Sequence, residues 1–258
     1  MIDNPREYET MAHVETEHWW YQSLHSRVQG TLADHFGRCN IAILDAGCGT
    51  GGLMKFLSKR GFNDLAGFDL SELAVQHCVN RGLTACVGDL GRISNLYPGR
   101  QFDCIVSNDT LYHVPADQRV QFLRQAAGRL KTDGILILNL PALHCLRGSH
   151  DKAVGITHRF TKPEITTLAS QAGLAISKMD YWPFVLSLPI WLVRTSQRLL
   201  RRDRGEAGPP VSDLKTYPPM LNRLLRNLIA LEKRFLPAAP FGSSLFVVLK
   251  TRERKFPL

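Results

Sequence analysis

A strand that runs directly into a glycine-rich turn is the feature that most constrains what this chain can fold into. Residues 41–44 (Ile-Ala-Ile-Leu) form a continuous apolar run, and Asp45-Ala46-Gly47-Cys48-Gly49-Thr50-Gly51-Gly52 follows at once. Such runs are typical of central parallel strands, which are buried on both faces. A helical pattern then begins at Leu53. The segment therefore predicts a strand, a glycine turn and a helix at the start of a parallel α/β sheet.

The rest of the chain continues this alternation of strands and helices. Further strands are predicted at residues 65–69, 83–87, 102–107, 135–139, 175–181 and 244–249. Helices are predicted at residues 3–37, 53–60, 71–82, 115–130, 161–172 and 221–235. Ser71 is expected to cap one helix, and Thr161-Lys-Pro-Glu is expected to form a capping box at another. Strands that alternate with helices predict βαβ units in a doubly wound α/β sheet.

Size and composition fit a large globular domain. The chain has 258 residues, of which 44% are hydrophobic and 21% charged, so it is long enough to bury a sizeable core. Its N-terminus carries no apolar signal segment, and none of its six cysteines stands in a Cys-x-x-Cys pair. We therefore expect a cytoplasmic protein with buried free thiols and without a metal site.

The positive charge is confined to the last quarter of the chain. The formal net charge is +9. Residues 187–258 hold 14 Lys and Arg against 5 Asp and Glu, whereas residues 1–186 hold 18 of each kind. A local excess of this size indicates an anionic partner, either a membrane or a nucleic acid, or else a solvated basic face.

The glycine turn suggests a nucleotide site without identifying the nucleotide. Glycines let a backbone approach a ligand closely, and a helix N-terminus offers unpaired N–H groups. Asp69 ends the second predicted strand, where an acid about 20 residues after the turn can accept hydrogen bonds from ribose hydroxyls. Gly47, Gly49 and Gly52 also satisfy the dinucleotide pattern G-x-G-x-x-G. On the turn alone, S-adenosylmethionine (SAM), a nicotinamide dinucleotide and no ligand at all remain open alternatives.

Further segments accompany the glycine turn in a fixed order along the chain. The ordered segments are ILDAGCGTGG, GFDLS, VGDL, FDCIVSNDTLYHV and LKTDGILILNLPA. Together they resemble the motifs of class I SAM-dependent methyltransferases. The segments HWWYQSLHSR, THRFTKPEI and PFGSSLFVVLK resemble pieces of bacterial methyltransferases that act on quinones, lipids and secondary metabolites. The resemblance implies SAM as cofactor and a Rossmann-like seven-stranded sheet in the order 3-2-1-4-5-7-6, with the last strand antiparallel.

The resemblance also implies roles for single residues. Asp69 would bind the SAM ribose, and Asp89 would accept from the adenine amino group. The loop of residues 47–51 would pack against the methionine part, with Asn108 nearby. The complete set of expected cofactor-binding residues is Asp45, Gly47, Cys48, Gly49, Gly51, Asp69, Leu70, Asp89, Leu90, Asn108 and Trp19. Trp19 belongs to the cluster Trp19-Trp20-Tyr21, which would either form a lid over cofactor and acceptor or pack an N-terminal helix on the core.

Two histidines are candidates for a catalytic base. Methyl transfer is a displacement at a sulfonium methyl, so the protein supplies alignment, exclusion of water and, for an oxygen nucleophile, a proton acceptor near neutral pH. His113 follows the fourth strand at the carboxyl edge of the sheet, where α/β proteins bind ligands. His158 lies in the loop after the fifth strand. Each could instead be an ordinary loop histidine. Tyr112 stands where relatives often carry Glu, which weakens an acidic or metal-binding role there.

Residues 182–240 interrupt the alternation and are predicted to be an insertion before the last strand. Residues 182–193 are strongly apolar but too short to span a bilayer, which takes about 20 residues. Five arginines follow by residue 204, then a Gly/Pro-rich linker at 205–219 and the amphipathic helix at 221–235. The insertion suits contact with a membrane headgroup region, a lid over an acceptor pocket, or a homodimer contact. Nucleic acid is the weaker expectation, because no RNA-binding module is recognisable.

These observations predict a SAM-dependent methyltransferase that acts on a small, lipophilic acceptor, with O-methylation as the first expectation. The alternatives are an RNA methyltransferase that uses the basic C-terminal region, and a SAM-binding regulatory protein without turnover. The expected division is a helical lid (1–40), a SAM-binding core (41–181), an apolar and basic helical insertion (182–240) and a final strand with a basic tail (241–258). We expect a cytoplasmic location that includes the inner membrane surface.

Overall fold

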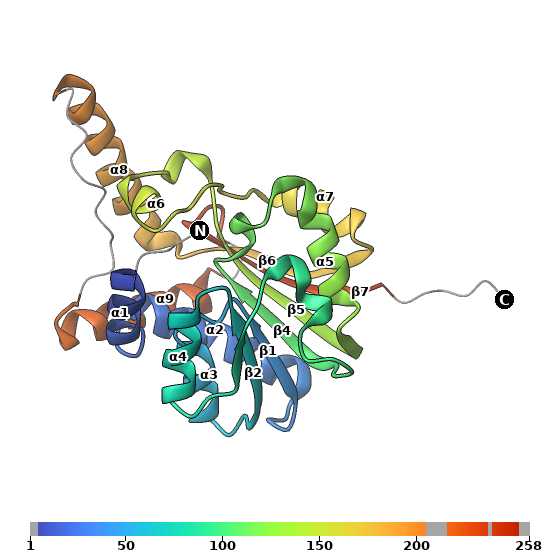
Figure 1. Cartoon of the computed structure of the whole chain (residues 1–258). Helices are drawn as coiled ribbons and strands as arrows, with labels where there is room; N and C mark the ends of the chain where they lie inside the picture. The colour runs from blue at the N-terminus through green and yellow to red at the C-terminus, as the bar shows by residue number, and fades with distance from the viewer. Residues whose placement is uncertain (1–4, 205–215, 237–238, 253–258) are drawn as a thin grey trace.

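A mostly parallel sheet forms the centre of the molecule (Figure 1). The computed structural model describes residues 5–204, 216–236 and 239–252. Within them, seven strands pair in the order β3-β2-β1-β4-β5-β7-β6. β7 is antiparallel to both of its neighbours, and the other pairs are parallel. The strands are β1 (Ala42–Ala46), β2 (Asp64–Asp69), β3 (Ala85–Val87), β4 (Phe102–Asn108), β5 (Leu130–Pro141), β6 (Leu174–Trp182) and β7 (Ser244–Thr251). The predicted fold class and strand order are confirmed.

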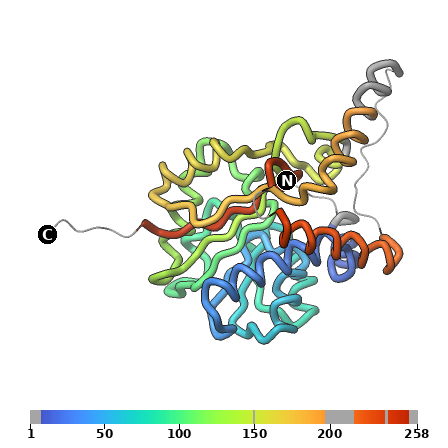
Figure 2. The backbone as a smooth tube through the Cα atoms, turned by 180° about the vertical axis from the view of Figure 1, so that it is seen from behind, coloured from blue at the N-terminus to red at the C-terminus, as the bar shows by residue number. Residues whose placement is uncertain are grey.

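Helices cover both faces of this sheet (Figures 1 and 2). The α-helices are α1 (Pro5–Val14), α2 (Trp19–Phe36), α3 (Gly52–Ser58), α4 (Glu72–Asn80), α5 (Arg119–Ala127), α6 (Ser149–Ala153), α7 (Lys162–Gln171), α8 (Phe184–Arg204) and α9 (Pro219–Phe235). Short 3-10 helices are η1 (Leu90–Asn95), η2 (Leu111–His113), η3 (Ala116–Gln118) and η4 (His144–Leu146). No described helix is long and apolar enough to cross a membrane.

The two helical layers are held by alternate side chains of the strands. Ala42 and Leu44 of β1 pack in the core that contains the buried faces of α5 and α7. Ile43 packs on the opposite face, in the core that contains residues of α2, α3 and α9. Successive side chains of a strand point to opposite faces, so a continuous apolar strand needs helices on both sides. The alternation of helices and strands supplies them.

Helices α8 and α9 project from one side of the body in both views (Figures 1 and 2). At their base, the Glu232 carboxylate accepts hydrogen bonds from the Phe184 and Val185 amides at 2.8 and 2.9 Å. α9 also packs against α2, and its Ile229 is buried in the core. The boundaries drawn for a separate insertion at 182–240 stay a prediction. Most of the linker expected at 205–219 lies outside the described residues.

Three local predictions need correction. The helix expected at 115–130 begins as the 3-10 turn η3, and α5 ends at Ala127. The strand expected at 135–139 is longer, because β5 extends from Leu130 to Pro141 and includes Asp133, which has a φ of 62°. The capping box at Thr161 is wrong, because the Thr161 side chain makes no cap hydrogen bond and Glu164 instead contacts His158 and Arg119. By contrast, the Ser71 hydroxyl accepts from the Ala74 amide as predicted.

The cysteines are only partly buried. Cys48, Cys78 and Cys104 are buried, as expected for thiols in apolar runs. Cys39 and Cys145 are exposed, because they lie in the turn before β1 and in η4. The prediction of buried thiols is therefore wrong for these two positions.

Candidate active site

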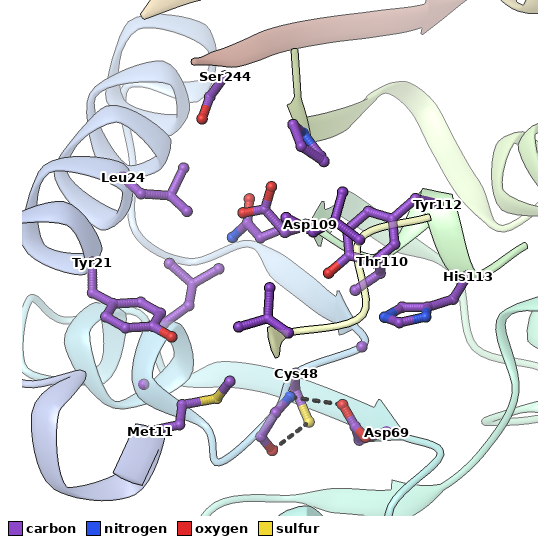
Figure 3. A pocket seen from close by; sticks show the side chains of 18 of the residues that line it. Met11, Tyr21, Leu24, Cys48, Asp69, Asp109, Thr110, Tyr112, His113 and Ser244 are labelled. Carbon is purple, nitrogen blue, oxygen red and sulfur yellow. Dashed lines mark hydrogen bonds between the residues drawn. The ribbon is translucent and has the colours of Figure 1, made fainter. Parts of the chain in front are cut away.

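A large cavity lies at the carboxyl ends of the parallel strands, with a volume of about 1020 Å³. This volume lies at the upper end of the usual range for a small-molecule site, which is roughly 300–1,000 Å³. Its walls come from α1, α2, the glycine turn, the ends of β2 and β4, the loop after β5, and α8. Figure 3 shows side chains from α1 (Met11), α2 (Leu24), the glycine turn (Cys48), the end of β2 (Asp69) and the segment after β4 (Asp109). The cavity is therefore large enough for a ligand of the size of a nucleotide cofactor.

The glycine turn follows β1 and forms part of the cavity wall next to the end of β2. The Gly47 and Cys48 amides both donate to the Phe68 carbonyl, at 2.8 and 2.9 Å. Gly47 has a φ of 81°, a conformation open mainly to glycine. A Cβ on Gly47 would collide with the Thr110 side chain. The absence of a side chain here is thus needed for packing within the protein, and it also leaves Gly47, Cys48 and Gly49 lining the cavity.

Gly51 does not line the cavity. It precedes α3 with a φ of 88°, and a Cβ there would press on Leu83 and the Cys78 sulfur. Gly51 therefore lets α3 begin here and lets α4, which contains Cys78, pack close to the glycine turn. The prediction that Gly51 contacts the cofactor finds no support in this placement.

Asp69 is held at the end of β2 by backbone donors. Its Oδ2 accepts from the Gly49 amide at 2.9 Å and its Oδ1 from the Ser71 amide at 3.0 Å. The Tyr8 hydroxyl donates to Oδ1 over 3.4 Å. Burial raises the pKa of Asp69, and these hydrogen bonds oppose the rise. A carboxylate has about four acceptor positions, so Asp69 keeps acceptor capacity toward the cavity that it lines.

The remaining acids of the glycine-loop side have different surroundings. Asp45 is buried, and burial together with nearby Asp69 and Glu15 raises its pKa to about 8. Asp89 is exposed and accepts from the Gly91 amide through Oδ1 at 2.7 Å. Both line the cavity, as do Leu70, Leu90 and Asn108. The Asn108 Oδ1 is buried and has no hydrogen-bond partner among the described residues.

The N-terminal helices close this side of the cavity. Buried Glu15 accepts from the Thr50 hydroxyl at 2.7 Å and forms an ion pair with Arg81. Arg81 also donates to the Ala12 carbonyl at 2.8 Å. Trp19 lines the cavity, and the Trp19 amide donates to Asn222 of α9 at 2.9 Å. The aromatic cluster therefore both packs on the core and borders the cavity.

Asp109, which the sequence did not single out, is the most notable acid of the site. It follows β4, lines the cavity and has a φ of 53°, which non-glycine residues rarely adopt. Its Oδ2 accepts from the Asn139 Nδ2 at 3.0 Å, and the Asn139 Oδ1 accepts from the Trp182 indole at 2.8 Å. Burial raises the pKa of Asp109 to about 7, against the lowering effects of the Asn139 bond and the Arg159 charge. Asp109 is thus oriented and close to its titration point at neutral pH.

The two predicted catalytic histidines differ in position. His113 lies at the cavity wall, and its ring is 4.3 Å from that of Tyr112. Although part of His113 is exposed, loss of hydration among the surrounding protein atoms lowers its pKa to about 4. His158 does not line the cavity. Its Nε2 contacts the Glu164 carboxylate at 2.9 and 3.1 Å.

Arg159, next to His158, occupies the place expected for the histidine. It lines the cavity and forms a two-bond ion pair with buried Asp151, at 2.7 and 2.8 Å. Its Nη1 donates to the Ala142 carbonyl at 2.8 Å. Neighbouring side chains of an extended segment point to opposite sides, and the segment is extended because Phe160 bridges to Ala142. Arg159 therefore faces the cavity and His158 faces away.

The chain shares a domain and a fold with known methyltransferases. Residues 43–134 match the family model of a methyltransferase domain. No curated protein matches the chain.

Solved structures match over nearly the whole chain. One match is a chain of the complex between the Haloferax volcanii Trm112 methyltransferase activator and a methyltransferase, with 19% identity and a TM-score of 0.60. The alignment covers 98% of this chain and 96% of that one. A TehB-like SAM-dependent methyltransferase from Corynebacterium glutamicum is 18% identical, with a TM-score of 0.55. The alignment covers 96% of this chain and 100% of that one. A SAM-dependent methyltransferase from Archaeoglobus fulgidus is 14% identical, with a TM-score of 0.55. The alignment covers 88% of this chain and 93% of that one. At these identities the likeness shows the fold alone.

The chain therefore contains a methyltransferase domain over residues 43–134, and S-adenosylmethionine (SAM) is the cofactor of this domain. Its seven-stranded sheet has the strand order of the class I methyltransferase fold.

Proposed function

We propose that the protein transfers the methyl group of SAM to a hydroxyl oxygen of a small, lipophilic acceptor. One observation carries the proposal. A single cavity contains the glycine turn with Asp69 on one side, apolar and aromatic side chains on another, and Asp109 in the same wall. The cavity thus combines a polar nucleotide half, an apolar half and an acid able to take a proton.

The polar half fits SAM. One acceptor position of Asp69 is unused and another is occupied only by the 3.4 Å contact from Tyr8, so these two positions suit the ribose hydroxyls. The Asp89 oxygen that does not bind Gly91 suits the adenine amino group. Asn108 Oδ1, buried without a partner among the described residues, suits the ammonium of the methionine part. SAM supplies an electrophilic methyl group when it is bound.

The apolar half suits a lipophilic acceptor. Its walls include the ring of Trp19, the side chain of Leu24, and Ile190 and Val193 of α8. Apolar walls exclude water and fix an acceptor through burial of its own apolar surface. Few polar groups would then be needed to orient its hydroxyl.

Asp109 is proposed as the proton acceptor in place of His113 and His158. A hydroxyl becomes a better nucleophile as its proton passes to a base, and the most effective base has a pKa near the working pH. Asp109 meets this condition with a pKa of about 7. The pKa of His113 is about 4, which makes it a weaker base, and His158 lies away from the cavity.

Calorimetry and transfer of a labelled methyl group test the proposal. We expect heat from SAM and from its demethylated product, and none from a nicotinamide dinucleotide. With methyl-labelled SAM, label should enter hydrophobic phenols and long-chain alcohols but not sugars or nucleosides. Tight binding of the dinucleotide without heat from SAM would contradict the nucleotide site. Label found only in RNA would contradict the acceptor class, and SAM binding without label in any acceptor would contradict turnover.

A further inference from the structure

Helices α8 and α9 contact each other, and each exposes large apolar side chains. We call the two sets together the docking face. Leu192 of α8 is 60% exposed, and Phe235 of α9 is 70% exposed. The docking face consists of Val185, Leu188, Trp191, Leu192 and Val193 of α8, and Met220, Leu221, Leu224, Leu231 and Phe235 of α9. Single exposed apolar residues are normal in soluble proteins, whereas a group of them on neighbouring elements marks an interaction site.

The stripe on α9 is not needed to attach this helix to the protein. Leu221, Leu224, Leu231 and Phe235 recur at spacings that place them on one side of a helix. α9 is attached through other positions, since Asn222, Ile229 and Glu232 are buried. Within residues 5–204, 216–236 and 239–252, the stripe is therefore not used for packing and can contact a partner.

The charges beside this stripe are positive. Arg223 and Arg234 lie next to the apolar stripe in helical projection. Glu232 is the only acid in the α9 sequence, and it is buried against backbone amides. The α8 sequence contains Arg194, Arg198, Arg201, Arg202 and Arg204 against the single acid Asp203. Both helices thus combine apolar residues with a cationic excess.

The docking face adjoins the cavity. Pro189, Ile190, Val193 and Arg194 of α8 line the cavity, while Leu188, Trp191 and Leu192 from the same turns are exposed outside it. Tyr217, just before α9, also lines the cavity. A surface bound to the docking face would therefore lie at the edge of the cavity.

We infer that α8 and α9 dock on an anionic lipid bilayer and that the acceptor enters the cavity from its surface. Helices that combine Leu, Trp and Phe with Arg bind at the headgroup boundary of anionic membranes. An isologous contact between two copies would bring the same cationic helices together. RNA would pair with the arginines but would leave the exposed leucines unused. The docking itself does not depend on turnover, whereas the entry of the acceptor rests on the proposed function.

Vesicle co-sedimentation of the full chain tests the docking. We expect binding to vesicles of phosphatidylcholine mixed with phosphatidylglycerol, and little binding to phosphatidylcholine alone. Arg223→Gln and Arg234→Gln should each weaken binding about fivefold, as expected when one cation near an anionic surface is lost. Leu192→Asp should weaken it more, about tenfold or beyond, because the change removes an apolar contact and adds a negative charge.

Matched variants on other surfaces provide the controls. Val79 of α4 is 52% exposed, and Lys59 is an exposed cation at the end of α3. Val79→Asp and Lys59→Gln should bind vesicles like the parent protein. If Leu192→Asp bound vesicles as well as Val79→Asp does, the inference would be overturned. So would a stable dimer that ignores vesicles, or salt-sensitive RNA binding without vesicle binding.

Calorimetry with SAM on the same variants separates the two proposals. Leu192 does not line the cavity, so Leu192→Asp should keep the cofactor affinity of the parent while it loses vesicle binding. Vesicle binding by a protein that gives no heat with SAM would leave the docking in place and contradict the proposed function. A protein that gives heat with SAM but binds no vesicles would leave the proposed function in place and contradict the docking.

Discussion

The two sides of the cavity are built by different means. On the cofactor side, backbone hydrogen bonds fix the geometry: the Gly47 and Cys48 amides meet the Phe68 carbonyl, and Asp69 accepts from two further amides. On the acceptor side, α8 lines the wall through Ile190 and Val193, while its residues Leu188, Trp191 and Leu192 are exposed. The first side is fixed by the strand ends, and the second depends on side chains of peripheral helices. A ligand with a constant shape suits the first side, and acceptors of variable shape suit the second.

Asp109 lies where these two sides meet, and its replacement should have the largest effect. Asp109→Asn keeps an acceptor for the Asn139 amide and tolerates a positive φ, but it cannot take a proton. We expect the rate of methyl transfer to fall by about 10²–10⁴-fold, with cofactor affinity unchanged. Single-turnover assays and calorimetry on the same sample measure both. An active Asp109→Asn would indicate an acceptor that needs no base, such as a carboxylate.

The pH profile of the parent protein sharpens this result. Asp109 has a pKa of about 7 and acts as a base only when it is deprotonated. The value of kcat/KM should therefore rise with pH and level off above about pH 7, since this profile reports groups of the free enzyme. A flat profile across this range would remove Asp109 as the base.

Asp109 also shows where prediction from the sequence ends. The strands, the glycine turn and Asp69 were predictable, because they depend on local apolar runs and on spacing along the chain. Asp109 gains its orientation from Asn139 on the next strand and from Trp182 beyond it, and such tertiary contacts have no local signal. Its one clue was an acid directly after the fourth strand, at the edge where α/β sheets bind ligands.

His158 lies outside the cavity, whereas its neighbour Arg159 lines it. The motif His158-Arg159 was correctly placed near the cavity, but which of two neighbours faces inward depends on the register of the extended segment at Phe160. A shift of one residue reverses every side chain of such a segment. The loop after β5 did not contain enough periodicity to fix that register.

Removal of the Asp69 carboxylate should have the next largest effect, confined to the cofactor side. Asp69→Ala would lose the acceptors proposed for the ribose and would release the Gly49 and Ser71 amides. Two charge-assisted hydrogen bonds are worth about 3 kcal/mol or more, so the affinity for SAM should fall by about 100-fold or more. Calorimetry measures the change, and vesicle binding serves as the control that should not alter. Unchanged affinity for SAM would refute the assignment of the ribose site.

The stability of Asp109→Asn should change in the opposite direction to its activity. The pKa of Asp109 is about 7 in the folded protein and about 3.9 when it is unfolded. Between these values the folded state holds the proton more tightly, so the parent loses stability as pH rises. The amide introduced by Asp109→Asn has no such proton to lose, and the variant should exceed the parent by up to about 4 kcal/mol at pH 8, with the gap closing toward pH 4. Thermal unfolding at several pH values measures the gap. A gap that does not change with pH would contradict the raised pKa.

Replacement of His113 should have the smallest effect and is the direct rival of the first prediction. His113 lines the cavity, but its pKa of about 4 makes it a weak base, and its exposed part lets water take over any contact that it makes. His113→Asn should therefore change the rate by no more than about threefold, equivalent to roughly 0.6 kcal/mol. Both variants should be assayed with the same acceptor and at saturating SAM, so that only the chemical step is compared. If His113→Asn lost as much activity as Asp109→Asn, the proton would pass through the histidine, and Asp109 would be left with an electrostatic role.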